Sequence, residues 1–293
     1  MATTFKRFAI VGGGNIGGIV ARELLKKNLA VTILTRDDTK ASLQEFKKNG
    51  ATLAKVDYEN RESLKNALMG VEAVVSAVGP MSMSTQIEVV YAAKEAGVEL
   101  FAPSEYGVYV TEGPNTPKGV VQSLLKKVDL PYTIFYAGIF YEFAPIIRLV
   151  SGASMRCAFG HKYSEGKMDV VGDGKTQFSL TAANDVGELV AQVVSTVPKR
   201  DLKWAKVPFE GDRKSPLEIA ALAQKKMGKE MELTFVDYEM NKANYLTDFA
   251  SFLSTLATDG LAVTGTNQEV AAARAKFYPN WKPTPYEAFI ANK

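Results

Sequence analysis

Glycines near residue 12 have the spacing of a phosphate-binding turn. Gly12, Gly14 and Gly17 follow an apolar run at residues 8–11 and precede an amphipathic stretch with the pattern of a helix. In a G-x-G-x-x-G turn, glycine allows a tight bend, close approach of the backbone to a pyrophosphate and close packing of helix on strand. Free N–H groups at the start of such a helix favour phosphate. We therefore expect a dinucleotide here, bound by Gly12, Gly13, Gly14, Asn15, Ile16 and Gly17.

A second group of residues indicates which dinucleotide would bind. A stretch with the character of a strand ends at Thr35, and Arg36 follows it directly. At this position an acid binds the ribose hydroxyls of NAD, whereas an arginine accommodates the 2′-phosphate of NADP. Because Arg36 comes first and Lys40 could add a second positive charge, we expect NADP(H), contacted by Thr35, Arg36 and Lys40. The acids Asp37 and Asp38 keep NAD open as an alternative, and a solvated surface charge is the alternative for Lys40.

The elements that position these residues alternate in type. From residue 8 to about 140, short apolar runs alternate with helical patterns, which is typical of a parallel sheet wrapped by helices. We expect strands at 8–11, 31–35, 51–56, 73–78, 99–102 and 132–137, and further helices at 39–48, 59–69, 85–96 and 118–128. The near-continuous apolar strands indicate a sheet buried on both faces. The sequence therefore predicts an α/β fold with a Rossmann-type doubly wound parallel sheet in residues 1–145.

The second half of the chain has a different sequence pattern. Residues 152–178 contain many glycines and short alternating segments, which are more typical of hairpins than of crossovers. Helices are expected at 186–194, after Ser215 and at 244–256, and a strand at 233–236. We interpret residues 146–293 as a smaller α/β substrate-binding lobe, some of whose elements return to the first domain.

Composition excludes several classes of protein. The chain has 293 residues and a net charge of +3, without a run of five or six basic residues that would indicate nucleic-acid binding. No apolar run approaches the ~18 residues of a membrane span, and the apolar run after Lys6 and Arg7 is interrupted by glycines, so we read it as a strand and not as a signal peptide. The single Cys157 excludes an intrachain disulfide, and the single His161 leaves no catalytic triad or histidine-rich metal site. We expect a cytoplasmic monomer or homodimer without a metal.

Further segments are distinctive in combination. They are residues 56–64, residues 74–79, the Gly-Asp-Gly-Lys pattern at 172–175 with residues 184–187, and above all the Pro-Ser-Glu-Tyr-Gly element at 103–107. With the glycine turn and Arg36, they resemble the NmrA-like and isoflavone reductase-like group of atypical short-chain dehydrogenases. The resemblance covers most of residues 5–190 and fades toward the C-terminus. It implies a Rossmann-type fold, NADP(H) as cofactor and reductase activity, with the cofactor also contacted by Ala77, Val78, Gly79 and Ser104.

The resemblance also implies a catalytic residue. In plant members of the group, a lysine on the helix after the 103–107 element serves as general acid/base, thirteen residues before a proline that precedes the next strand. Lys118 stands thirteen residues before Pro131. Beside a positively charged nicotinamide and an apolar wall, a lysine has its pKa lowered toward neutrality, which suits proton transfer near pH 7. The alternative is an ordinary residue in the first turn of a helix, although a positive charge there opposes the helix dipole.

The Tyr-x-x-x-Lys pair of ordinary short-chain dehydrogenases occurs twice, at Tyr163 with Lys167 and at Tyr238 with Lys242. Such matches are expected by chance in a chain with this many tyrosines and lysines. Neither pair follows the expected strand at 99–102, and we therefore set both aside.

Aromatic residues gather near the ends of two expected strands, at 99–102 and 132–137. Tyr106, Tyr109, Phe140 and Tyr141 would line a pocket suited to an aromatic or apolar ligand. Core packing is the alternative for Phe140.

These residues favour an NADPH-dependent reductase that transfers hydride to a small aromatic or conjugated substrate, such as a carbonyl, an enone or a quinone methide. Lys118 would handle the accompanying proton. Ser104 could polarise a carbonyl or shape the loop beneath the nicotinamide, and Glu105 could anchor that loop by hydrogen bonds. The alternative from another class is a non-catalytic NADP(H)-binding redox sensor that reports to a protein partner. A sugar-nucleotide epimerase is disfavoured because no Tyr-x-x-x-Lys pair is well placed.

Overall fold

A computed structural model describes residues 3–143 and 166–291. Its central sheet is parallel and has the strand order β3-β2-β1-β4-β5. The strands are β1 (Arg7–Val11), β2 (Ala30–Thr35), β3 (Thr52–Lys55), β4 (Ala73–Ser76) and β5 (Leu100–Ala102). Because β1 pairs with both β2 and β4, the chain winds outward to one side and then crosses to the other. This reversal of strand order is the switch point at which Rossmann-type folds bind ligands, and the predicted fold class is confirmed.

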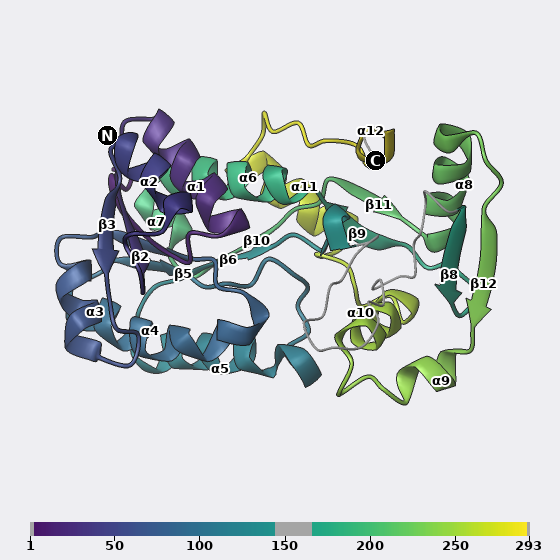
Figure 1. Ribbon diagram of the computed structural model, residues 1–293, viewed down its shortest axis with the longest axis horizontal. Coiled ribbons are helices and arrows are strands. Elements are labelled where there is room, and N and C mark those ends of the chain that lie inside the picture. Colours follow the sequence, from purple (N-terminus) through teal and green to yellow (C-terminus); the bar gives the residue numbers. More distant parts are fainter. Residues whose placement is uncertain (1–2, 144–165, 292–293) are drawn as a thin grey trace.

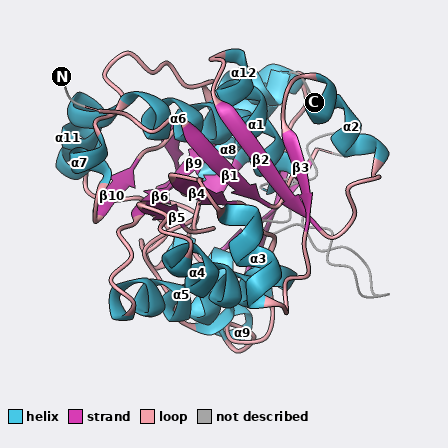
Figure 2. Ribbon diagram, turned by 90° about the vertical axis from the view of Figure 1, so that its left-hand side faces the viewer, coloured by secondary structure: helices cyan, strands magenta, loops and turns pink. Residues whose placement is uncertain are grey.

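Helices cover both faces of this sheet (Figure 2). On one face lie α3 (Arg61–Leu68), α4 (Gln86–Glu95) and α5 (Thr116–Lys127), and on the other lies α1 (Asn15–Lys26), while α2 (Ala41–Lys48) follows β2 near the edge strand β3. Successive residues of β1 point to opposite faces. Phe8 and Ile10 belong to the core beneath α1, whereas Ala9 and Val11 belong to the core beneath α3 to α5. Both faces of the sheet are therefore buried, as the apolar strands predicted.

Elements from later in the chain extend this sheet. β6 (Thr133–Tyr136) lies beside β5 through a bridge between Phe101 and Tyr132, and β10 (Ala205–Pro208) pairs in parallel with β6. α6 (Ala183–Thr196) packs along α1, and α11 (Asn267–Phe277) packs on β10. The close fit of α6 on α1 depends on Gly187, where an added Cβ would lie 2.6 Å from Ile19.

The remaining elements form a second group around their own core, at the right-hand end of Figure 1. It contains the sheet β11-β9-β7, made of β7 (Ile139–Phe140), β9 (Phe178–Thr181) and β11 (Asp212–Lys214), and the pair β8 (Lys167–Val171) with β12 (Glu232–Val236). Its helices are α8 (Pro216–Met227), α9 (Tyr238–Lys242), α10 (Phe249–Thr258) and α12 (Tyr286–Ala291). Short helical segments elsewhere are η1 (Pro80–Thr85), η2 (Gly113–Asn115), η3 (Tyr141–Phe143) and α7 (Lys199–Leu202).

Several expectations for the second half need correction. β8 does not form a hairpin, because it pairs in parallel with β12, far along the chain. The helix expected at 244–256 begins only at Phe249, since the Asp248 side chain caps it by accepting the Ser251 N–H. The helix expected after Ser215 is confirmed, with a capping box between Ser215 and Glu218. Residues 157 and 161, the single cysteine and histidine, lie outside the described residues.

Along residues 3–143 and 166–291, we find no helix with the length and apolar character needed to cross a bilayer.

The contact of α6 with α1 leads to a first prediction. Gly187→Ala places a methyl group 2.6 Å from Ile19 between two packed helices. We expect a loss of about 1–3 kcal/mol in the free energy of unfolding, because extra volume in a packed contact forces a backbone shift. Urea unfolding measures it. Glu188→Ala, at an exposed position of the same helix, serves as control and should change stability by less than about 0.5 kcal/mol. Equal stability of the two variants would contradict the packing described here.

Candidate functional site

The glycine turn joins β1 to α1 at the carboxyl edge of the sheet. Gly12 has φ of +95°, and a Cβ there would lie 2.7 Å from the Ala77 carbonyl oxygen. A Cβ on Gly17 would lie 1.9 Å from the Gly12 carbonyl oxygen. The protein's own backbone therefore requires glycine at both positions.

Gly14 is different, because its missing side chain faces open space. A Cβ on Gly14 would meet no atom of the described residues within 4 Å. Gly14 is also the N-cap of α1, and within the described chain no side chain caps this helix start or places an acid in its first turn. Gly14 and Asn15 are both exposed, and Ile16 is half-buried. The turn thus offers unpaired N–H groups and an uncrowded approach, which fits a pyrophosphate.

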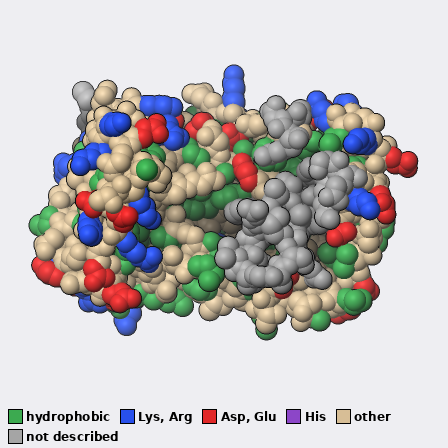
Figure 3. Space-filling view, viewed as in Figure 1, with side chains coloured by type: hydrophobic (Ala, Val, Ile, Leu, Met, Phe, Trp, Pro, Cys, Tyr) green, Lys and Arg blue, Asp and Glu red, His purple; other side chains and the backbone are tan. Residues whose placement is uncertain are grey.

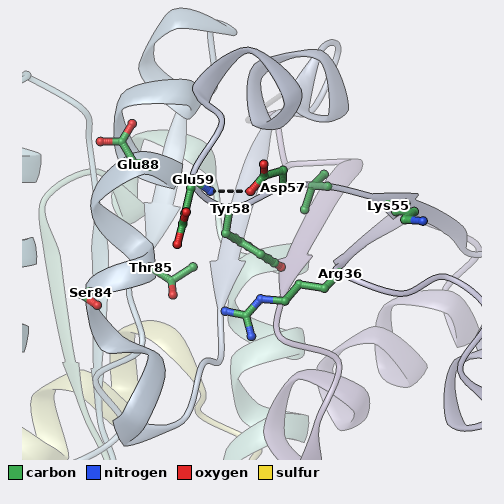
Figure 4. A pocket seen from close by; sticks show the side chains of 9 residues that line it. Arg36, Lys55, Asp57, Tyr58, Glu59, Ser84, Thr85 and Glu88 are labelled. Atoms are coloured by element: carbon green, nitrogen blue, oxygen red, sulfur yellow. Dashed lines mark hydrogen bonds between the residues drawn. The ribbon is translucent and has the colours of Figure 1, made fainter.

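Arg36 borders a cavity of about 900 Å³ beyond the ends of β2 and β3 (Figure 4). The cavity is lined by Arg36, Lys55, Val56, Asp57, Tyr58, Glu59, Ser84, Thr85 and Glu88. The Arg36 guanidinium carbon lies 5.4 Å from the centre of the Tyr58 ring. This cation–π contact stabilises the position of the guanidinium over the ring face. Tyr58 in turn donates its hydroxyl to the Leu34 carbonyl at 2.9 Å, and burial raises its pKa to about 12. An exposed arginine is thus supported from beneath by a partly buried ring.

Asp37, which kept NAD open as an alternative, is engaged in a local turn. Its carboxylate accepts the Thr39 backbone N–H at 2.9 Å and the Thr39 hydroxyl at 2.6 Å. These hydrogen bonds hold the pKa of the carboxyl below its usual range. Lys40, at the start of α2, and Lys55 also act on this carboxylate electrostatically, so two positive side chains lie near Asp37. Thr35 is buried, and its hydroxyl bonds the Asp37 backbone.

Two lining residues, Lys55 and Tyr58, were not assigned a role from sequence. Both lie at or just after the carboxyl end of β3. The rule that ligands bind at the carboxyl ends of parallel strands was a signal that could have found them.

The loops after β4 and β5 are tied to each other. Ala77 donates its N–H to the Val11 carbonyl at 2.8 Å, beside the glycine turn. The Ser104 hydroxyl donates to the Val78 carbonyl at 2.8 Å, and the Ser104 N–H donates to the Gln86 side chain at 2.8 Å. Ser104 is buried. Of the two roles considered for this serine, shaping the loop matches these contacts, because its proton is already donated to a carbonyl of the protein.

Lys118 lies in the first turn of α5 and reaches back over the 103–107 element. Its Nζ donates to the Glu105 carbonyl at 2.8 Å. A Cβ on Gly107 would lie 3.0 Å from the same Nζ, so glycine leaves room for the ammonium there. Burial lowers the pKa of Lys118, and the nearby Glu105 carboxylate opposes this shift. The side chain is partly exposed, so a desolvated amine remains within reach of the surface.

The four aromatic residues expected in a ligand pocket fall into two pairs. Tyr106 and Tyr141 are buried, and their hydroxyls donate to the backbone carbonyls of Ser76 and Thr284. They belong to the packing of the protein. Tyr109 is 37% exposed and its ring centre lies 3.9 Å from that of Tyr136, while Phe140 is half-buried at the end of β7. Only Tyr109 and Phe140 of the four thus have surface to offer a ligand.

The Tyr-x-x-x-Lys pair at Tyr238 and Lys242 lies on α9, in the second group of elements. The Lys242 Nζ donates to the Tyr238 oxygen at 2.8 Å, and the Tyr238 hydroxyl donates to Asp259. This pair is remote from the carboxyl edge of the central sheet (Figure 1). Tyr163 of the other pair lies outside the described residues.

The face of the molecule drawn in Figure 3 is hollowed between its two ends, and hydrophobic side chains are visible inside the hollow.

The described residues contain no group of three or more His, Cys, Asp or Glu side chains that could hold a metal ion.

Known proteins of related kinds match this chain over nearly its whole length. A family model described as the NmrA-like family matches residues 4–290. Phenylcoumaran benzylic ether reductase PT1 of Pinus taeda is 26% identical over 98% of both chains, and isoflavone reductase of Glycine max is 24% identical over 97% of this chain and 92% of its own. Among solved structures, AtPrR2 with NADP+ and (+)-pinoresinol has a TM-score of 0.80 at 21% identity, covering 100% and 99% of the two chains. Leucoanthocyanidin reductase of Vitis vinifera in complex with NADPH has a TM-score of 0.80 at 20% identity, covering 98% of each.

The glycine turn generates a paired prediction for the ligand-free protein. Gly17→Ala should lower the free energy of unfolding by about 1–3 kcal/mol, because its methyl collides with the Gly12 carbonyl. Gly14→Ala should lower it by clearly less than Gly17→Ala, because its methyl meets open space and only the preference of the N-cap for glycine over alanine is lost. Urea unfolding of both variants beside the wild type checks the pair. Comparable destabilisation by both substitutions would show that the turn has another geometry.

Proposed function

The chain belongs to the NmrA-like family, and we propose that it is an NADPH-dependent reductase of small aromatic or conjugated molecules. The observation that carries this proposal is the position of Lys118. Its partly desolvated amine is anchored to the Glu105 carbonyl, on the element that Ser104 joins to the loop beside the glycine turn. A group able to hold and release a proton thus lies along the same sheet edge as a phosphate-binding turn.

The dinucleotide would lie along the carboxyl edge of the sheet. The pyrophosphate would bind the N–H groups of residues 12–17, where Gly14 leaves an open approach. Arg36 and Lys40 would meet the 2′-phosphate, with Tyr58 holding Arg36 in place. Ala77, Val78, Gly79 and Ser104 would border the nicotinamide. The NADP+ and NADPH named in the two solved relatives support this choice of cofactor.

NADPH, when bound, supplies a hydride, and this chain must manage the proton that accompanies it. Lys118 would donate that proton to the oxygen of the substrate. Burial lowers the pKa of its ammonium, so the proton is released more readily than from a solvated lysine. The hydrogen bond to the Glu105 carbonyl fixes the position of the amine before substrate arrives.

We propose that the substrate is aromatic or apolar and that Tyr109 and Phe140 contact it. Both have exposed surface, unlike Tyr106 and Tyr141. The names of the relatives support an aromatic substrate, since a phenylcoumaran benzylic ether, an isoflavone and pinoresinol are all named there. The hydrophobic side chains in the hollow of Figure 3 are in keeping with such a ligand.

A two-step assay tests the proposal. NADPH and NADH are first titrated by fluorescence, and NADPH oxidation is then followed with a panel of aromatic ketones, enones, quinones and benzylic ethers. We expect tighter binding of NADPH and turnover of at least one aromatic class. Tight NADPH binding without turnover over a broad panel would instead favour a redox sensor of the same fold.

Arg36→Ala tests the choice of dinucleotide. Loss of charge-assisted hydrogen bonds to the 2′-phosphate costs about 1.5–3 kcal/mol, so the NADPH dissociation constant should rise about 10- to 100-fold, while that of NADH stays nearly constant. Fluorescence titration with both cofactors measures the change. Arg200→Ala, at an arginine whose side chain is 82% exposed, is the matched control. An unaltered ratio of NADPH to NADH affinity would show that the 2′-phosphate is recognised elsewhere.

Lys118→Met tests the proton donor while preserving most of the side-chain volume. Removal of a general acid should lower kcat by about 10²- to 10⁴-fold, with the NADPH dissociation constant changed by less than about threefold. In the wild type, kcat should fall as pH rises through the lowered pKa of Lys118, because the ammonium loses its proton. The variant should lack this fall. A variant with full kcat and the wild-type pH profile would exclude Lys118 as the donor.

A further inference from the structure

We propose that Glu105 is a positioning residue whose buried carboxylate keeps Lys118 charged until substrate takes its proton, so that the two side chains act as one proton-holding unit. This inference rests on the proposed function, since it assigns the control of the same proton donor. The observation behind it is a buried carboxylate oxygen that the packing of the loop does not use.

Glu105 is 4% exposed, in the loop that leaves β5. Its Oε1 accepts a hydrogen bond from the Gln122 side chain of α5 at 3.0 Å. Its Oε2 is also buried and has no hydrogen-bond partner among the described residues. Buried carboxylates are normally satisfied, because an unpaired charge in the interior is costly. An orphaned oxygen therefore calls for an explanation other than loop stability.

Other acids of this chain anchor distant segments by accepting hydrogen bonds from backbone N–H groups. Glu142 accepts the Ala183 N–H with both oxygens at the start of α6, and Asp185 accepts the N–H and hydroxyl of Thr284. Glu105 makes no such bond to the backbone. Its loop is held by the contacts of Ser104 and Tyr106 with neighbouring loops and strands. The anchoring role considered for Glu105 from sequence is thus shared: Oε1 accepts the Gln122 amide of α5, whereas Oε2 takes no part in it.

Lys118 is the partly buried cation that acts on this carboxylate. Its Nζ is fixed on the backbone carbonyl of Glu105 at 2.8 Å, and the charges of the two side chains attract each other. Burial raises the pKa of Glu105 and lowers that of Lys118, and the attraction between the two opposes both shifts. The negative charge of Glu105 therefore favours the charged form of Lys118, and the positive charge of Lys118 favours the charged form of Glu105, although both groups are desolvated.

The other groups that face Glu105 from neighbouring elements do not replace Lys118. Lys206 of β10 attracts the carboxylate, yet its side chain is exposed and its charge is screened by solvent. Tyr136 of β6 and Tyr106 of the same loop also act on it, and burial keeps their pKa values above the usual range, so both remain neutral. Lys118 is thus the partly desolvated cation beside this carboxylate within the described residues.

Lys118 would pass the proton of its ammonium to the substrate oxygen, while bound NADPH would supply the hydride to a substrate carbon and become NADP+. Lys118 becomes a neutral amine beside the Glu105 carboxylate. A proton from solvent then restores the ammonium, favoured by the carboxylate that has stayed in place.

Glu105→Gln tests the pair without any substrate or cofactor. The reaction of Lys118 with an amine-directed reagent, followed by mass spectrometry from pH 6 to pH 10, reports how much of the amine is neutral. Removing the negative charge should raise the labelling rate of Lys118 at neutral pH roughly threefold to tenfold, which corresponds to a fall of up to about one pKa unit. Glu112→Gln, at an exposed acid that bonds Tyr245, should leave the rate unchanged. An unchanged Lys118 rate in Glu105→Gln would overturn the inference.

A second measurement does not require Glu105→Gln to fold. Infrared spectroscopy of the carboxyl C=O band reports protonation of buried acids in Lys118→Met and in Lys126→Met, an exposed lysine of the same helix. Loss of the Lys118 charge should move the ionisation of one buried acid to higher pH, and a shift of that band in Glu105→Asp assigns it to residue 105. The same titration in Lys118→Met and Lys126→Met would contradict the pairing.

These readouts separate the inference from the proposed reductase. If labelling and infrared titrations shift but no panel substrate is turned over, the pair stands and the proposed reductase fails. If the wild type turns over substrate while Glu105→Gln leaves both the Lys118 labelling and the alkaline limb of the kcat pH profile in place, the reductase stands and the pair fails.

Discussion

The contact between the glycine turn and the loop after β4 is the constraint on which the rest of the site depends. Gly12 can meet the Ala77 carbonyl only because it has no Cβ and a positive φ. Along the same sheet edge, the Ser104 hydroxyl bonds the Val78 carbonyl, one residue after Ala77, and Lys118 bonds the Glu105 carbonyl, one residue after Ser104. The parallel register of β1 with β4 and of β4 with β5 brings these loops to the same edge. The glycine turn and the amine of Lys118 are therefore held along one edge of the sheet by contacts between successive loops.

The cations at the two ends of this edge, Arg36 and Lys118, differ in their exposure to solvent. Arg36 is exposed and rests on an aromatic ring, so its guanidinium remains available to an anionic group. Lys118 is drawn among protein atoms beside a buried acid, where its charge is unfavourable. An arginine suits the first place because it does not lose its proton, and a lysine suits the second because it can. The residue types follow from the solvent exposure of each place.

Local patterns were sufficient to predict the central sheet and the place of the glycine turn, because each strand and helix carries its own periodicity. The C-terminal limits of several helices and the cap at Ser215 also follow from short-range signals. What could not be predicted depends on partners far along the chain. Tyr106 bonds Ser76 and Tyr141 bonds Thr284, so neither could be recognised as packing from its neighbours in sequence. The parallel pairing of β8 with β12 and the orphaned oxygen of Glu105 likewise arise only when distant segments meet.

Aromatic residues from late in the chain complete the core around the first strand region. Phe277, Tyr278 and Trp281 share a hydrophobic core with Phe5 and Phe8 of the first strand region, and the Tyr278 hydroxyl donates to the Pro208 carbonyl at the edge of the extended sheet. The ribosome synthesises β1 long before these aromatic residues emerge. The apolar surface beside β10 and Phe209 therefore stays uncovered until these residues have been synthesised. A chain interrupted before residue 277 would leave this apolar surface beside β10 and Phe209 exposed to chaperones and to other copies of itself.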